Sequence, residues 1–317
     1  MKVSIIVLTY NNKALTIKCL KALFANTPKI YLDDVLVVDN ASADGTQDYL
    51  KKQKGIRIFL NKENLGFSKG NNFGASEAKG EILIFLNNDT EVRKGWLLPM
   101  LEIIKKKREV GAVGAKLLFP DGTIQHAGVV ISEDRIPRHI YYQDNPKKSY
   151  VNKEREYKAV TAACVAIPKT VFEKVKGFDE EYVNGLEDVD LCLRIRKAGY
   201  SVWYSPKSVV YHHEKVAPGR FKYNDHNYRL YMQRWGGEEP DEHQYMINDG
   251  FSKLQIFWHD LASMSYSWGE GAKTPIQFKF LRYLYLPYQK ITTAIKLLAK
   301  GDIKTLNQKV KKVFKNA

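Results

Sequence analysis

Long apolar runs are absent from this sequence: no stretch of about 18 or more consecutive apolar residues, the length of a membrane-spanning helix, occurs. The N-terminal stretch KVSIIVLTYNN also lacks the small-residue cleavage site of a signal peptide. We therefore expect a cytoplasmic protein, in which any membrane contact would be peripheral, at the inner face of the cell membrane.

Cysteine is scarce: Cys19, Cys164 and Cys192 lie far apart in the chain and show no paired spacing. That pattern fits neither a disulfide framework nor a zinc site, so we expect three reduced core residues. Hydrophobic residues still make up 44% of the 317 residues, which is enough for one large domain with an appendage or for two domains.

Familiar phosphate-binding and nucleic-acid-binding signatures are missing too. The glycines of NKENLGFSKGNN form neither the G-x-G-x-x-G of a Rossmann dinucleotide site after the first expected strand nor the G-K-[ST] of a P-loop. The sequence therefore favours neither of these two kinds of nucleotide site. The net charge of +15 suggests nucleic acid, but residues 274–317 hold ten Lys or Arg and one acid, and so supply nine of these charges. Without a zinc finger, an RNP strand or a basic leucine zipper, we do not expect nucleic acid as a partner.

The first half of the chain does contain a regular alternation of β-branched runs and helical patterns. Strands are expected at residues 3–9, 34–40, 56–61 and 81–89, and helices at residues 14–26, 46–53, 67–80 and 96–107. Because the strands lack polar alternation, they fit a parallel sheet that is buried on both faces. The pattern predicts a doubly wound α/β fold, in which ligands bind beyond the carboxyl ends of the strands.

Polar residues cluster at four of these strand ends, namely at residues 9–12, 39–40, 61 and 87–89. We predict that the four ends meet at one crevice. Two of the clusters, TYNN and NNDT, are also good turn sequences, and each alone is explained as a turn. Asp39 is suited to a hydrogen bond with a base or ribose, and Asp89 could hold a divalent cation if a diphosphate supplies further oxygens.

The second half offers fewer clear patterns. A polar segment at residues 135–156 is interpreted as a loop or lid. Glu187 and Asp188 open an expected helix, where they either complement its dipole or supply a general base for a sugar hydroxyl. His212 and His213 follow a β-branched run, and such a pair is as typical of a surface as of a metal or phosphate contact.

In their order, these motifs resemble the family 2 glycosyltransferases of the GT-A fold, in particular the bacterial branch of rhamnosyltransferases and related O-antigen and cell-wall enzymes. The resemblance rests on eight segments: VSIIVLTYNN, VVDNASADGT, NLGFSKGNN, FLNNDTEV, DGTIQHAG, TAACVAIPKTVFEKVKGFDE, LEDVDLCLRIRKAGY and PKSVVYHH. It implies a GT-A catalytic domain at residues 1–235, with a mixed, mainly parallel α/β sheet. Residues 236–317 would form an aromatic, then basic, helical extension.

Carried over residue by residue, the resemblance implies a nucleotide-sugar site. The nucleotide and sugar would be bound by Thr9, Tyr10, Asn11, Asp39, Asn64, Gly66 and Phe67. Asp89 matches the last acid of the family's D-x-D element, which holds Mg²⁺ or Mn²⁺ against the donor diphosphate. Asn87 and Asn88 would assist in cofactor binding. They stand where many relatives have Asp, so we expect the metal to bind weakly until the donor arrives.

The resemblance also implies a reaction. Asp188 falls on the family's catalytic base, with Glu187 beside it, and His212 or His213 falls on a late histidine associated with the metal or diphosphate. His126 recurs in this branch and is expected near the sugar pocket. The implied reaction is an inverting, metal-dependent transfer of a sugar from a UDP- or dTDP-sugar to a hydroxyl of a glycan, lipid-linked or other cell-surface polysaccharide acceptor.

Two other functions stay open. A catalytically inactive nucleotide-sugar or carbohydrate-binding module is compatible with the reduced metal motif. A sugar nucleotidyltransferase would need a Gly-rich, basic loop after its first strand, and VLTYNN is no such loop. The basic, aromatic residues 274–317 fit a membrane surface, a cover over the catalytic domain or a homodimer contact.

Overall fold

The computed structural model describes residues 1–213 and 223–267, and the chain divides into two compact units, Met1–Glu242 and His243–Ala317. The strands are β1 (Val3–Thr9), β2 (Leu32–Asp39), β3 (Arg57–Leu60), β4 (Ile82–Asn87), β5 (Thr90–Val92), β6 (Val110–Leu118), β7 (Ile124–His126), β8 (Val129–Ile131), β9 (Pro137–His139), β10 (Arg155–Glu156), β11 (Cys164–Pro168) and β12 (Ser201–His212). The helices of the first unit are α1 (Lys13–Asn26), α2 (Thr46–Leu50), α3 (Gly66–Glu77), α4 (Leu97–Lys106), α5 (Lys169–Lys174), α6 (Glu187–Lys197) and α7 (Asn224–Trp235), with short 3-10 turns at Lys29–Tyr31 and Tyr150–Asn152.

The remaining described helices are α8 (Glu242–Asn248) and α9 (Lys253–Ser267). The basic residues 274–317, for which a membrane or dimer contact was predicted, lie outside the described residues. Within the described part of the chain, no helix is both long and apolar enough to cross a membrane.

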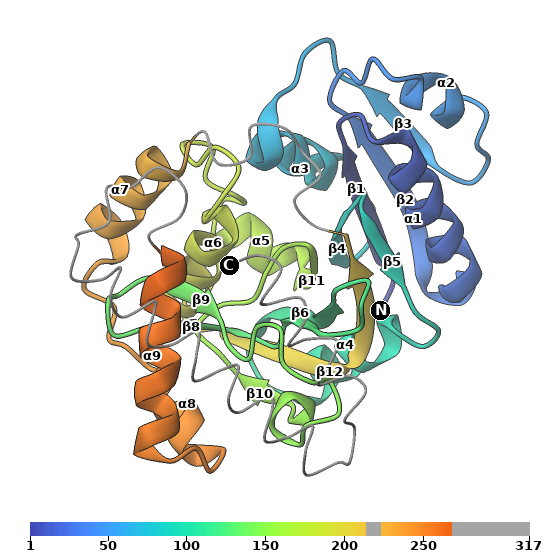
Figure 1. Cartoon of the computed structure of the whole chain (residues 1–317). Coiled ribbons are helices and arrows are strands. Elements are labelled where there is room, and N and C mark those ends of the chain that lie inside the picture. Colours follow the sequence, from blue (N-terminus) through green and yellow to red (C-terminus); the bar gives the residue numbers. More distant parts are fainter. Residues whose placement is uncertain (214–222, 268–317) are drawn as a thin grey trace, which may run out of the picture. The chain divides into compact units, whose positions relative to one another are not determined.

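One mixed sheet organises the first unit (Figure 1), and its strand order is β10-β12-β6-β11-β4-β1-β2-β3, with β5 paired to β12 and β7 paired to β6. β4, β1, β2 and β3 run parallel, as their repeated strand–helix patterns predict. β11 lies antiparallel between β4 and β6. The predicted mixed, mainly parallel α/β sheet is therefore confirmed.

Helices cover both faces of this sheet because its strands are apolar on both sides. Ile5 and Ile84 pack on one face with residues of α1 and α4. Ile6 and Phe85, their neighbours in sequence, pack on the other face with residues of α3, α5 and α6. Successive strand side chains point to opposite faces, so an uninterrupted apolar run is what two covered faces require.

Close packing of α3 on β1 depends on glycine. A Cβ built on Gly74 would lie 2.6 Å from Ile6 Cγ2, closer than a carbon atom allows.

The three cysteines are free and buried, as predicted. Burial raises the pKa of Cys19 and Cys192 to about 12, so both remain thiols at neutral pH.

The polar segment at residues 135–156 is more structured than the loop interpretation allowed. It contains β9, which pairs with β8, and β10, which pairs with β12. Tyr141 between them is only 6% exposed. The sequence did not predict β9 and β10 because strands of two or three residues are too short to show a periodicity.

Candidate functional site

The four polar strand ends lie along one edge of the sheet, as predicted. Thr9 at the end of β1 is in register with Asp39 at the end of β2, and Leu8 is in register with Asn87 at the end of β4. Asn61, after β3, donates from Nδ2 to Asn40 Oδ1 at 2.8 Å. Parallel strands deliver their carboxyl ends to the same edge, so residues far apart in sequence become neighbours here.

The loop after β1 is fastened to the loop after β2. The Asn11 backbone N–H donates to Ser42 Oγ at 2.7 Å, and Asn11 Oδ1 accepts the Ala43 N–H at 2.9 Å. Asn11 and Asn12 both adopt left-handed backbone conformations, with φ of 56° and 58°, which Asn tolerates well. Tyr10 remains 45% exposed, so its ring is available at this edge.

Asp39 is a buried carboxyl group with one oxygen left over. Its Oδ1 accepts the Ser42 N–H at 2.9 Å and Gln47 Nε2 at 2.8 Å. Its Oδ2 has no hydrogen-bond partner, and water cannot reach it because the residue is 0% exposed. Because an unmet buried acceptor is costly, this oxygen is suited to a donor group on a ligand.

The start of α3 is held beside Asp39 by Asn40. Asn40 Nδ2 donates to Asn64 Oδ1 at 3.2 Å and to the Gly66 carbonyl at 3.0 Å. Gly66 has a φ of 77°, a conformation that favours glycine. Phe67 packs edge-on against Phe178, with 5.5 Å between ring centroids. The predicted residues Asn64, Gly66 and Phe67 are thus fixed at the same edge.

The turn after β4 separates the two asparagines of the NND motif. Asn88 Nδ2 donates to Thr9 Oγ1 and to Thr16 Oγ1, both at 3.0 Å, and so ties the turn to β1 and α1. Asn87 Nδ2 instead lies 3.5 Å from His212 Nε2. The two side chains therefore have different surroundings, and Asn87 is the one on the side of His212.

Asp89 and His212 form a close pair across the β5–β12 pairing, in which His212 is in register with Thr90. His212 Nε2 lies 3.0 Å from Asp89 Oδ1, and the two residues are 5% and 9% exposed. On the other side of the ring, Nδ1 lies 2.7 Å from Gln125 Oε1. An amide oxygen only accepts, so Nδ1 is the nitrogen that donates to Gln125, and Nε2 is the nitrogen that faces the Asp89 carboxylate.

This pair fits a divalent cation that is completed by further ligands. A ring nitrogen and a carboxylate oxygen 3.0 Å apart can share a proton or bind one cation together, because adjacent ligands about 2.1 Å from an octahedral ion also lie about 3.0 Å apart. Among the described residues, however, no group of three or more His, Cys, Asp and Glu side chains could hold a metal by itself. The protein ligands suffice only if a bound molecule supplies the remaining oxygens.

His213 has a different environment from His212. Its Nε2 lies 2.7 Å from Glu91 Oε1, while its backbone N–H donates to the Asp89 carbonyl at 2.9 Å. Its ring is therefore engaged by Glu91, away from the Asp89 carboxylate. Of the two histidines left open by the sequence, the geometry favours His212 as the metal neighbour.

Asp188 and Glu187 begin α6 near the end of β4. Asp188 Oδ2 accepts the Ala162 N–H at 3.1 Å, and its Oδ1 accepts the Val189 N–H at 2.9 Å. The next residue, Ala163, accepts the Asn87 N–H at 3.0 Å. One short segment thus links Asp188 to the end of β4, two residues before Asp89.

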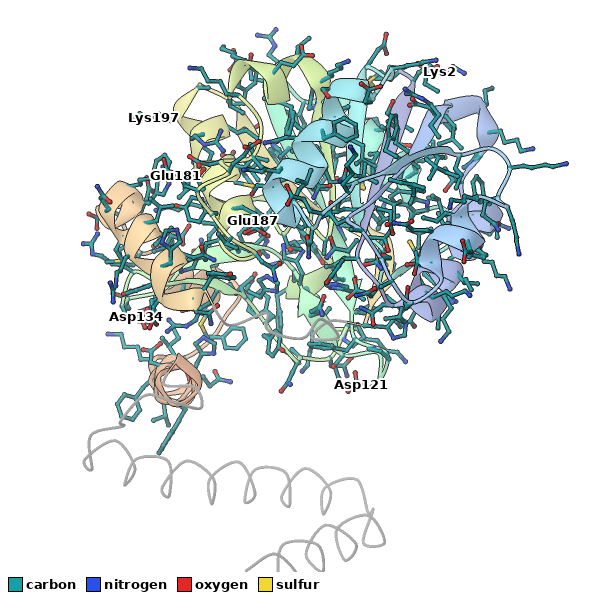
Figure 2. The ribbon with its side chains drawn as sticks, turned by 90° about the horizontal axis from the view of Figure 1, so that it is seen from above. Lys2, Asp121, Asp134, Glu181, Glu187 and Lys197 are labelled. Carbon is teal, nitrogen blue, oxygen red and sulfur yellow. The ribbon has the colours of Figure 1, made fainter. Side chains whose placement is uncertain are left out.

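Glu187 is largely enclosed. It is 6% exposed and accepts the Gly185 N–H. In Figure 2 it is labelled within the outline of the first unit, whereas Lys2 is labelled at the outer edge. Leu186 before it has a φ of 69°, so the turn into α6 is conformationally strained. Backbone strain of this kind is found preferentially at functional sites.

β7 contributes two residues, of which only His126 was singled out in the sequence. Gln125 bonds His212, as described above, and both residues are buried. His126 is 0% exposed, and burial, with His139 nearby, holds its pKa well below the ordinary value. Gln125 was missed because its partner lies 87 positions away; its place beside His126 in DGTIQHAG was the available signal.

Comparison with known families shows which family the chain belongs to. The family described as "Glycosyl transferase family 2" matches residues 4–173, and the one described as "N-terminal domain of galactosyltransferase" matches residues 147–216. The O-antigen biosynthesis protein RfbC of Myxococcus xanthus is 34% identical over 223 residues, which cover 68% of this chain and 18% of that protein. This chain therefore spans about a fifth of that relative's length.

A shorter relative is matched over most of its length. The N-acetylglucosaminyl-diphospho-decaprenol L-rhamnosyltransferase of Mycobacterium tuberculosis is 28% identical over 59% of this chain and 68% of its own. Among solved structures, GalNAc-T7 with UDP, GalNAc and Mn²⁺ aligns with a TM-score of 0.57 at 18% identity, over 84% of this chain and 57% of that one. The mannosyltransferase PcManGT of Pyrobaculum calidifontis, with GDP-Man and Mn²⁺, aligns with a TM-score of 0.54 at 19% identity, over 96% and 87%. At such identities the structural matches establish the fold.

Proposed function

Because this chain belongs to glycosyl transferase family 2 and has the GT-A fold, we propose that it is an inverting, metal-dependent transferase that uses a UDP- or dTDP-sugar. The acceptor would be a hydroxyl of a glycan, preferably a lipid-linked or other cell-surface polysaccharide precursor. The rhamnosyltransferase relative, whose name specifies a decaprenol-linked acceptor, supports that choice. A cytoplasmic site of action, at the inner membrane face, fits the same acceptor. The division into a catalytic domain at residues 1–235 and an extension is part of this proposal.

One observation carries the proposal: three different chemical functions lie at neighbouring strand ends. Asp39 offers a buried, unpartnered oxygen. Asp89 and His212 form the pair that fits a cation. Asp188 is held beside β4 by the Ala162 N–H. The first would bind the nucleotide, the second would bind the diphosphate with its cation, and the third would take the proton from the attacking hydroxyl.

The nucleotide end is assigned to the β1–β2 edge. Asp39 Oδ2 would accept an N–H of the base or an O–H of the ribose. Thr9, Tyr10 and Asn11 border the same position, and Asn64, Gly66 and Phe67 would line the passage toward the sugar. The ring N–H of uracil or thymine would satisfy Asp39 Oδ2 directly, which fits the UDP- or dTDP-sugar that we propose as the donor.

At the reacting centre, Asp188 would take the proton from the acceptor hydroxyl while that oxygen forms a bond to the anomeric carbon. The bond between that carbon and the diphosphate oxygen breaks at the same time, and the nucleoside diphosphate leaves. Asp89 and His212, with Asn87 nearby, would hold Mg²⁺ or Mn²⁺, which when bound stabilises the negative charge on the leaving diphosphate. Glu187 would contact the donor sugar or the acceptor.

The experiment that tests the proposal is a panel of nucleotide sugars, with and without Mn²⁺, that detects released nucleoside diphosphate and glycosylated product. Replacing Asp188 by Asn should lower transfer by about 10²–10⁴-fold, the usual contribution of a general base, while donor affinity stays within about two-fold. A variant that keeps more than a tenth of the activity would show that Asp188 is not the base. Product formed without any divalent cation would contradict the metal assignment.

A further inference from the structure

Both ring nitrogens of the buried His126 form hydrogen bonds with backbone groups. Its Nδ1 lies 2.9 Å from the Ala115 carbonyl oxygen, and its Nε2 lies 3.3 Å from the Thr161 backbone nitrogen. A carbonyl oxygen only accepts and an amide N–H only donates. The ring must therefore be neutral, with its proton on Nδ1 and its Nε2 lone pair directed at Thr161.

The amide after Thr161 is the one that binds Asp188. The Ala162 N–H donates to Asp188 Oδ2 at 3.1 Å, and the Ala163 carbonyl accepts the Asn87 N–H at 3.0 Å. The three residues Thr161, Ala162 and Ala163 are 8%, 3% and 4% exposed. Within the segment, Thr161 Oγ1 accepts the Ala163 N–H at 3.3 Å. The bonds to His126, Asp188 and Asn87 are made by its backbone groups, and His126 accepts the first of them.

We propose that His126 is a positioning residue for Asp188, which acts by fixing the Thr161–Ala162 backbone. Being 0% exposed, it has no surface on which to touch substrate, so its effect passes through Ala162. Misplacement of a reacting group by about 1 Å can cost about 100-fold in rate, so a backbone anchor of this kind has a measurable effect. The inference rests on the proposed role of Asp188 as the base.

Two substitutions separate this role from simple packing. In His126→Gln, the amide oxygen can take the place of Nε2 and still accept the Thr161 N–H. In His126→Asn, the shorter amide can replace only the Nδ1–H donor to Ala115, and Thr161 loses its acceptor. We expect His126→Asn to lower kcat by about 10–100-fold with little change in the donor KM, and His126→Gln to lose less than about five-fold. Equal losses in the two variants would overturn the inference.

A double-mutant cycle tests whether His126 acts through Asp188. Added to Asp188→Asn, the His126→Asn substitution should reduce the residual activity by less than about two-fold, because the group that it positions is already gone. Independent losses that multiply would show that His126 acts elsewhere. Melting temperatures of all variants check that each is folded.

Two measurements do not need activity and keep the inference separate from the proposed function. Imidazole ¹⁵N chemical shifts of the unsubstituted protein should show His126 as the neutral Nδ1–H tautomer; the Nε2–H tautomer would overturn the inference. Hydrogen exchange in the peptide of residues 159–165 should be faster in His126→Asn than in His126→Gln, and equal rates would also overturn it. If no donor on the panel is turned over, the proposed function fails, while these two results still decide whether His126 fixes Thr161.

Discussion

At the scale of single residues, Gln125 decides which nitrogen of His212 faces Asp89. Its Oε1 lies 2.7 Å from His212 Nδ1, which keeps the proton on that nitrogen. Nε2 is then available to a cation at the position next to Asp89 Oδ1. Such outer partners of a ligating histidine orient the ring and raise its basicity.

We therefore predict that Gln125→Leu raises the Mn²⁺ concentration needed for half-maximal transfer by about 10–100-fold, the usual cost of losing an outer partner. Gln125→Glu keeps an acceptor for Nδ1–H and serves as the matched control, with a change of less than about three-fold. The measurement is a Mn²⁺ titration of activity at saturating donor. An unchanged Mn²⁺ requirement in Gln125→Leu would show that Gln125 does not orient the metal ligand.

Sequence reasoning found two members of this contact chain but not the third. Asp89 and His212 stand out because acids and histidines at strand ends are chemically conspicuous. Gln125 does not, because its importance comes from the pairing of β7 with β6 and of β6 with β12. Long-range register is set by tertiary packing, which no local pattern encodes.

At the scale of elements, the first four strand–helix repeats were predictable, while the antiparallel additions were not. β1 to β4 follow apolar runs bounded by turn residues. β11 enters the same sheet antiparallel, between β4 and β6, although it is not their neighbour in sequence. That insertion brings Ala162 and Ala163 to the end of β4, and so decides where Asp188 lies.

Asp241 links β8 to the residues after α7 and gives a pH-dependent contribution to stability. Its Oδ1 accepts the Ile131 N–H at 2.7 Å, and its own N–H donates to the Ile131 carbonyl at 2.9 Å. Burial raises the pKa of Asp241 from 3.8 to about 6. The folded state therefore binds this proton more tightly than the unfolded chain, and stability falls as the pH rises from about 4 through about 6.

Asp241→Asn keeps an acceptor for Ile131 but carries no charge. Above the folded-state pKa of about 6, we expect the variant to have a free energy of unfolding higher by about 1–2 kcal/mol, a value reduced from the full shift because the group is partly hydrated. Near pH 4 the difference should disappear, which urea unfolding at both pH values will show. The exposed Asp48→Asn is the control and should change neither value by more than about 0.5 kcal/mol. A gain of equal size at both pH values would rule out the charge as its cause.

At the scale of the whole molecule, charge is concentrated in one part of the sequence. Residues 274–317 carry nine of the fifteen net positive charges, with the acid Asp302 counted. Each basic residue close to anionic lipid contributes about 1 kcal/mol, and salt screens this attraction. A lipid-linked acceptor would then be met at the surface where the protein is already bound.

We predict that the full chain sediments with vesicles rich in phosphatidylserine at low salt and is released at about 0.5 M NaCl. A variant that ends at residue 273 should remain in the supernatant. Phosphatidylcholine vesicles provide the neutral control. Undiminished binding by the shortened variant would show that the basic segment is not the membrane contact.

The pairing of β5 with β12 places Asp89 and His212, from distant parts of the chain, within 3.0 Å of each other. A donor that arrives with its metal would bind both segments at once and act as a reversible cross-link in the folded state alone. At 100 times its dissociation constant, such a ligand adds about 2.7 kcal/mol to stability. Heat resistance thus becomes a reporter of donor choice: the nucleotide sugar that most raises the melting temperature with Mn²⁺ can be identified before any acceptor is known.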